Sequence, residues 1–310
     1  MKKIYSIMIA AAVAFAFTSC EETTPDNGTD GTEQGGGDET EEPGDDTEEP
    51  GGEPEDPNTL TYGGVTYKTV TLSNGQTWMA EPLRYIPEGM TVSSDPSENA
   101  HIWYSYTFDA EGNPVADETT VEERGYLYDM YAALGGVEIT TENCETFEGV
   151  QGICPDGWHI PTWEEYFMLC GKSTTMDNGN GASSNTEALF YDSEYDGGKV
   201  LTANELGWNV VFSGVRQKNT FTATNTQYVK MAISETNCTI ENFYGAPAMT
   251  YYISSTFDKM KEDSKTGEIS SIYFMSMMTT FTKTYSEGRL SMANAHCEMG
   301  QQLRCIKDAE

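Results

Sequence analysis

The chain has 310 residues, of which 37 % are hydrophobic and 11 % aromatic, so it can build a core of ordinary size and is not disordered throughout. It carries 50 Asp and Glu residues against 17 Lys and Arg, a formal net charge of −33 at pH 7. A protein of this charge repels phosphate groups, which excludes nucleic acid as a partner.

The first 19 residues have the pattern of an export signal. Lys2 and Lys3 precede an apolar run over residues 4–17, and Thr-Ser-Cys follows at 18–20. A helix of about 14 residues rises only about 21 Å, short of the roughly 30 Å hydrocarbon core, so we expect a cleaved signal. We predict that Cys20 is lipidated and becomes the first residue of the mature protein. The alternative is an ordinary secretory signal, because Phe17 and Thr18 depart from the usual residues at those positions.

Residues 20–58 are predicted to form a disordered, lipid-anchored tether. Between residues 21 and 58 there are 16 acidic residues, no Lys or Arg, and many Gly and Pro. Such a segment cannot bury a core, and its own charge extends it. The membrane is then contacted through the lipid alone. Glu21 and Glu22 resemble the tag that carries Bacteroidetes lipoproteins to the outward face of the outer membrane, where we expect this chain; the alternative is a periplasm-facing lipoprotein.

Residues 59–310 are predicted to be the folded part. An even number of cysteines in an exported chain favours disulfides, and six remain after Cys20. They allow 15 full pairings, among which spacing alone does not choose. None has the paired spacing of a zinc site, so we expect no metal and no other cofactor. The six are Cys144, Cys154, Cys170, Cys238, Cys297 and Cys305.

In chain order, residues 62–72 read as hairpin-like β-structure, and Ser-Asn-Gly at 73–75 reads as a turn. Residues 88–123 read as an elaborated loop with one aromatic strand at 103–106. Two helices are expected, one over residues 127–134 and one beginning at Thr162, where Glu165 occupies the capping-box position. Short strands are expected after Trp208, at 210–212, 251–253, 272–274 and 303–306. This order indicates an α+β domain.

Several strings resemble, in order, the Fibrobacter succinogenes major paralogous domain. The resemblance covers roughly residues 60–308, and its most specific parts are Cys-Pro-Asp-Gly-Trp-His-Ile-Pro-Thr at 154–162 and Leu-Arg-Cys-Ile-Lys-Asp at 303–308. Pro82 and Asp129 replace the asparagines usual in that family, and residues 88–123 and 217–250 form longer polar insertions. The other matching strings are residues 75–85, 125–133, 197–201 and 253–256.

The resemblance implies a C-type-lectin-like domain with two helices and a twisted antiparallel sheet core, similar also to formylglycine-generating enzymes. It further implies a disulfide between Cys154 and Cys305. It implies no particular activity.

Four candidate sites in the sequence favour a structural interpretation. His159 lies in the sharpest motif, but we expect it to form local hydrogen bonds beside a helix start. Residues 192–197 imitate the beginning of a calcium loop, yet the twelfth position is Ala203 instead of Glu. Glu-Pro-Leu at 81–83 lacks the last ligand of a lectin calcium site. Cys297 and Cys305 are eight residues apart, unlike the close pair of a copper enzyme.

We therefore expect a surface-anchored lipoprotein whose lectin-like domain binds an extracellular glycan or protein without catalysis. The alternative is a structural component of the cell envelope with no discrete small ligand. A binding protein should show a concave aromatic patch among the inserted loops.

Overall fold

The computed structural model describes residues 56–105, 107–108, 114–116, 118–172, 183–194, 197–217, 243–244, 249–282 and 285–309, all within the compact unit Glu53–Glu310. The expected signal at 1–19, the lipidated Cys20, the tether up to residue 55, and Cys238 lie outside the described residues. The described part has an α+β fold that is mostly β.

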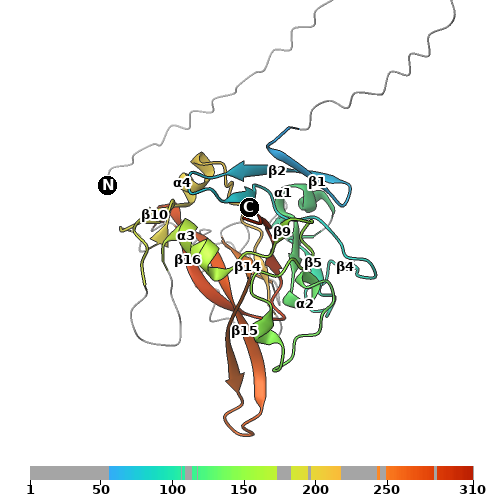
Figure 1. Cartoon of the computed structure of the whole chain (residues 1–310). Coiled ribbons are helices and arrows are strands. Elements are labelled where there is room, and N and C mark those ends of the chain that lie inside the picture. Colours follow the sequence, from blue (N-terminus) through green and yellow to red (C-terminus); the bar gives the residue numbers. More distant parts are fainter. Residues whose placement is uncertain are drawn as a thin grey trace, which may run out of the picture. The chain divides into compact units, whose positions relative to one another are not determined.

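The smaller sheet joins the two ends of the described chain (Figure 1). All its strand pairs are antiparallel, and the expected β-structure and turn near residue 74 are confirmed. Gly63 and Gly64 turn the first hairpin with φ of 57° and 79°, a region that suits glycine. In spatial order the strands are β1 (Thr59–Tyr62), β2 (Val65–Thr71), β3 (Thr77–Met79), β18 (Ile306–Lys307) and β9 (Trp158–His159).

The larger sheet is mixed instead of purely antiparallel, because β14 pairs with β17, and β4 with β5, in parallel. Its order is β10 (Tyr191–Asp192), β11 (Gly197–Gly198), β16 (Tyr285–His296), β15 (Ile269–Thr282), β14 (Met249–Glu262), β17 (Gln301–Gln302), β8 (Tyr126–Tyr128), β5 (Ile102–Tyr104) and β4 (Val92–Ser93). Two small ribbons pair β6 (Thr107–Phe108) with β7 (Pro114–Val115) and β12 (Val215–Arg216) with β13 (Phe243–Tyr244).

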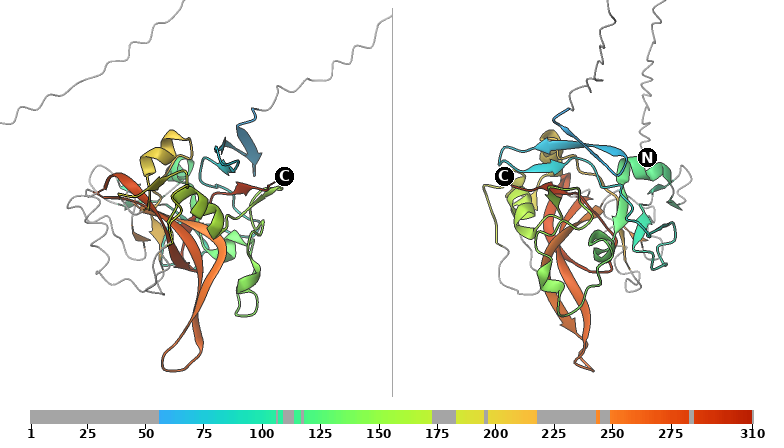
Figure 2. Two further views of the ribbon diagram at one scale, coloured as in Figure 1. Left: turned by 60° about the vertical axis from the view of Figure 1, so that its left-hand side comes forward. Right: turned by 45° about the vertical axis from the view of Figure 1, so that its right-hand side comes forward.

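The expectation of short strands is wrong for the centre of this sheet. The apolar runs at 251–253 and 272–274 are parts of β14 and β15, which have 14 residues each, and β16 has 12. Polar residues continue both strands: Lys261 and Ser270 lie at the exposed outer ends. Ser276 is buried instead, and its hydroxyl donates a hydrogen bond to the Tyr252 carbonyl. The two strands project as a twisted hairpin from the body of the domain (Figures 1 and 2). Residues 210–212 form no strand.

The long strands separate two hydrophobic cores. Successive side chains of a strand point to opposite faces. Ile272 and Phe274 therefore pack into the core that also holds the cysteines 154 and 305. Met275 and Met277 pack into the other core, around Trp208.

Helices are few and short in the described chain. The helix beginning at Thr162 is confirmed as α3 (Trp163–Cys170), with the expected capping box. The expected helix over 127–134 is wrong in its first half, which is β8. Asp129 then caps a single turn by accepting a hydrogen bond from the backbone N–H of Ala132. The helical elements are α1 (Val121–Arg124), α2 (Met130–Ala133), α3, α4 (Val200–Glu205) and the 3₁₀ turns η1 (Glu118–Thr120) and η2 (Cys144–Thr146).

Candidate functional site

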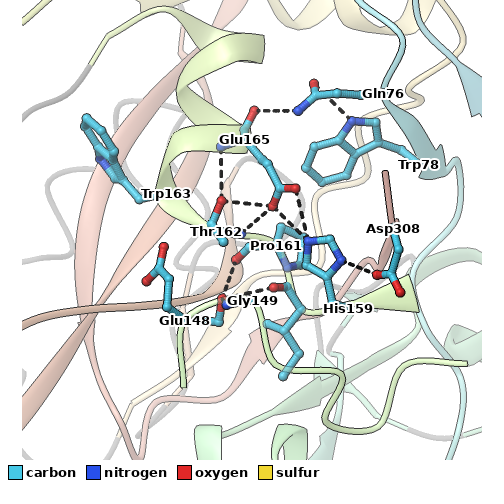
Figure 3. Close-up of polar contacts among 12 residues, drawn as sticks. Gln76, Trp78, Glu148, Gly149, His159, Pro161, Thr162, Trp163, Glu165 and Asp308 are labelled. Carbon is cyan, nitrogen blue, oxygen red and sulfur yellow. Dashed lines mark hydrogen bonds and ion pairs between the residues drawn. The ribbon is translucent and has the colours of Figure 1, made fainter. Parts of the chain in front are cut away.

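His159, the most suggestive residue of the sequence, is held between two carboxylates (Figure 3). Its Nδ1 lies 2.7 Å from Oδ1 of Asp308, and its Nε2 lies 3.0 Å from Oε1 of Glu165. The imidazole comes from β9, Glu165 from the first turn of α3, and Asp308 from just beyond β18. Both ring nitrogens are therefore engaged, and neither remains for a ligand or a metal.

The electrostatics of this cluster stabilise a charged pair. The hydrogen bond to Glu165, followed by the one to Asp308, raises the pKa of His159 against the opposing effect of burial. Although burial favours the neutral acid, the bonds from His159 and from the backbone of Thr162 lower the pKa of Glu165 overall. The His159 side chain is only 14 % exposed. The arrangement resembles a structural cluster more than a proton-transfer site, because both ring nitrogens are already bonded to carboxylates of the chain.

Glu165 has a second role, which explains its position in the sequence. Its Oε2 accepts hydrogen bonds from the backbone N–H of Thr162, at 2.7 Å, and from the Thr162 hydroxyl, at 2.9 Å. The Thr162 hydroxyl oxygen also accepts a hydrogen bond from the Glu165 backbone N–H. One carboxylate thus caps α3 and fixes His159.

The disulfide between Cys154 and Cys305 is confirmed, with a Cα–Cα distance of 5.8 Å and both residues buried. It joins the segment before β9 to the residue before β18, and these two strands carry or adjoin His159 and Asp308. Cys144, Cys170 and Cys297 are free thiols. Burial raises the pKa of Cys170 to about 11 and that of Cys297 to about 12, so neither is a ready nucleophile.

The cation sites considered in the sequence have other partners where the structure describes them. Asp192 Oδ2 lies 3.0 Å from the Lys199 ammonium, and Glu81 Oε2 lies 2.8 Å from the Arg84 guanidinium. Residues 195 and 196 of the calcium-like loop lie outside the described residues. Within the described ranges no group of three or more His, Cys, Asp or Glu side chains could hold a metal ion. Cys305 is unavailable to Cys297 because it is in the disulfide.

A polar groove of about 680 Å³ is a stronger candidate site. Its volume lies within the usual range for ligand sites, although it is open to solvent along part of its surface. Four segments line it: residues 66 and 68 of β2, residues 81, 82 and 84, residues 122–124 of α1, and residues 209–212. The expected aromatic patch is not what this groove offers, since Phe212 is the sole aromatic residue in its lining.

Arg84 forms one side of the groove. Its guanidinium donates hydrogen bonds to Glu81 and to the backbone carbonyl of Glu122, both within 2.9 Å, and its Cζ lies 4.9 Å from the centre of the Tyr67 ring. Its Nε is buried with no hydrogen-bond partner among the described residues. Gly125 permits the close approach of α1 to this side: its φ is 66°, and a Cβ there would lie 2.4 Å from Cβ of Pro82.

Two arginines hold a second wall of the groove, residues 209–212. The buried guanidinium of Arg304 donates hydrogen bonds to the backbone carbonyls of Trp208 and Asn209, and its Cζ lies 4.4 Å above the Trp208 ring. Arg124 donates to the Phe212 carbonyl at 2.6 Å. Asn209 is held at φ 58°, which is unusual outside glycine. The wall is therefore fixed through its backbone, which prearranges the side chains on it.

Two charged groups of the groove have no partner among the residues that the structure describes. The Lys68 ammonium and the Glu122 carboxylate are on exposed residues and have no hydrogen-bond or ion-pair partner in the part of the chain that the structure describes. Sequence reasoning missed this site. The string at 75–85 and Arg304 of the terminal string were noticed, but nothing in the sequence shows that Arg304 supports a wall beside residues 81–84.

A family model, the Fibrobacter succinogenes major domain, matches residues 73–307. No curated protein and no solved structure matches the chain. Among the described residues no helix is long and apolar enough to span a bilayer.

Proposed function

Because the chain belongs to the Fibrobacter succinogenes major domain family, we propose that its folded domain is a binding module on a surface-anchored lipoprotein. The domain recognises an extracellular glycan or protein in the polar groove and performs no catalysis. The observation that carries this proposal is the groove itself, where two charged side chains have no partner among the described residues and the neighbouring backbone is held by arginines.

The rigidity of the walls supports binding. A site built on backbone segments held by buried arginines loses little conformational freedom when a ligand enters. The exposed side chains of the groove can then form with the ligand the hydrogen bonds that they form with water in the free protein.

The groups around the groove support the part of the proposal that assigns it no catalysis. Its lining contains no His, Cys or Ser. Its carboxylates at 81 and 123 are already paired with Arg84 and Arg124. The His159 cluster is occupied on both ring nitrogens.

The proposal also includes the fold type and the cellular location of the protein. The domain is of the C-type-lectin-like type, which places ligands among variable loops. Cys20 carries the lipid, and the acidic segment up to residue 58 holds the domain away from the outer surface of the outer membrane.

A glycan-array screen tests the binding function. The chain from residue 20 onward, carrying Cys20→Ser so that it stays soluble, is oxidised and applied to the array with calcium and again with chelator. We expect binding that persists in chelator and that weakens with Lys68→Met. Lys261→Met is the matched control, because Lys261 is also an exposed strand lysine but is not in the groove lining.

Loss of binding in chelator would contradict the site, since the groove would then not be the recognition surface. If no glycan binds, the same chain is used to capture extracellular proteins, and capture must again depend on Lys68. No ligand of either class, together with self-association in sedimentation, would favour the envelope component instead.

A further inference from the structure

The charges in the groove balance, although the domain around it is strongly acidic. Residues 59–310 have 34 acidic and 15 basic residues. The groove lining has three of each: Lys68, Arg84 and Arg124 against Glu81, Glu122 and Glu123. The groove lining therefore has a higher proportion of basic residues than the domain as a whole.

The balance is achieved largely by pairing within the site. Arg84 lies 2.8 Å from Glu81, and Arg124 lies 3.4 Å from Glu123. Lys68 and Glu122 are left, one donor of hydrogen bonds and one acceptor. Because the two signs are equally numerous, a ligand with a full charge of either sign gains no net electrostatic attraction from the groove.

The remaining lining is apolar on one side. Val210 is buried, while Val211 and Phe212 are partly exposed along the wall fixed by Arg124. On the charged side, the exposed Lys68 ammonium is a hydrogen-bond donor and the exposed Glu122 carboxylate an acceptor, neither with a partner among the described residues. The groove thus offers apolar side chains together with one unpartnered donor and one unpartnered acceptor.

We infer that the ligand of this groove is an uncharged glycan, bound with its hydroxyl groups at Lys68 and Glu122 and its C–H face on Val211 and Phe212. A sugar hydroxyl both donates and accepts a hydrogen bond, so neighbouring hydroxyls match a mixed set of cations and carboxylates. The C–H face of a pyranose ring is apolar and suits a valine and phenylalanine wall. This inference rests on the proposed function and specifies the ligand class of the same site.

Titration calorimetry with the soluble Cys20→Ser chain tests the inference. The probes are neutral hexasaccharides of glucose, mannose and xylose, and an acidic hexasaccharide of galacturonic acid. Each is titrated at about 50 and about 500 mM salt, because only a charged ligand loses affinity through screening. Lys68→Met and Glu122→Gln are compared with Lys261→Met.

We expect at least one neutral probe to bind with an affinity that salt changes less than about twofold. Lys68→Met should weaken that binding about tenfold, the effect of one hydrogen bond from a charged donor. Glu122→Gln should change it less than about threefold, because the amide still accepts a hydrogen bond. Lys261→Met should leave it unchanged.

Three outcomes would overturn the inference. If the acidic probe binds more tightly than the neutral ones and is released by salt, the binding function stands but the ligand class is wrong. If neutral probes bind equally well to Lys68→Met, the glycan lies elsewhere. If no probe binds while the array or protein capture finds a Lys68-dependent partner, the groove is used by another class of ligand.

Discussion

Two polar clusters of the domain, one around His159 and one around Arg84, differ in whether all their charged side chains have partners among the described residues. In the His159 cluster, both ring nitrogens are bonded to carboxylates of the same chain, and Glu165 also caps α3 (Figure 3). In the groove around Arg84, Lys68 and Glu122 have no partner among the described residues.

This difference separates structure from recognition. A polar group that is satisfied inside the protein stabilises the fold and has nothing to offer a ligand. A polar group held on a rigid wall without a partner adds little to stability and is available for binding. Changes in the first cluster should therefore alter the free energy of unfolding, and changes in the second should alter affinity.

The largest effect is expected at the disulfide beside the His159 cluster. Breaking the Cys154–Cys305 bond, which spans 151 residues, should lower the free energy of unfolding by about 5 kcal/mol on the chain-entropy model. Urea unfolding with and without dithiothreitol measures this. A chain carrying Cys297→Ser should lose the same amount on reduction, because that thiol is free. Equal stability in both conditions would show that the bond does not form in solution.

Arg304→Met should combine both kinds of effect. It leaves the carbonyls of Trp208 and Asn209 without their donor, which should cost about 3 kcal/mol of unfolding free energy. It should also weaken glycan binding, because the wall at 209–212 is no longer fixed. Lys307→Met, on an exposed residue of the same terminal segment, is the control. Full affinity in folded Arg304→Met would contradict the role given to that wall.

His159→Asn should cost about 2 kcal/mol near pH 6, where its charged hydrogen bonds are intact. The folded-state pKa of His159 is raised above the ordinary value of 6.5, first by Glu165 and then by Asp308. The stability that it contributes is therefore complete below about pH 6.5 and is lost as the pH rises through the folded-state pKa.

Denaturation of wild type and His159→Asn between pH 5.5 and about pH 9 measures this dependence. The difference between them should shrink toward high pH. Asp308→Asn should have a smaller effect, because the Asp308 side chain is 56 % exposed. A difference that grows with pH would have the wrong sign for this account.

Lys68→Met should have the smallest effect on stability, within about 0.5 kcal/mol, because its exposed ammonium has no partner in the described chain. Urea unfolding beside Lys261→Met measures it. A loss greater than about 1 kcal/mol would mean that Lys68 has a structural role and that its effect on binding needs reinterpretation.

Local patterns predicted the parts of the fold that local chemistry decides. Thr162 and Glu165 three residues apart predict the start of α3, and the structure has their capping box. The prediction of a helix over 127–134 was wrong in its first half. Leu127 has helical spacing to Tyr131 and Leu134, yet it lies in β8, which pairs with β5 and β17. Long-range pairing decided that segment, and no local signal reports it.

The same limit applies to the candidate sites. The family resemblance predicted the Cys154–Cys305 bond, and the structure confirms it. The groove could not be predicted, since it joins β2, α1 and residues 209–212, and since Arg304 holds that last segment from 95 residues further along the chain. The distinctive sequence pattern around His159 has a structural role, because this residue bonds to the carboxylate of Asp308, 149 residues further along the chain.

Hydrogen–deuterium exchange of the soluble Cys20→Ser chain, with and without a saturating array hit, tests most directly whether the groove is the binding site. The account predicts slower amide exchange at residues 81–84, 122–125 and 209–212, with no change at 159–165. Protection centred on 159–165, or protection that is the same in Lys68→Met, would contradict it.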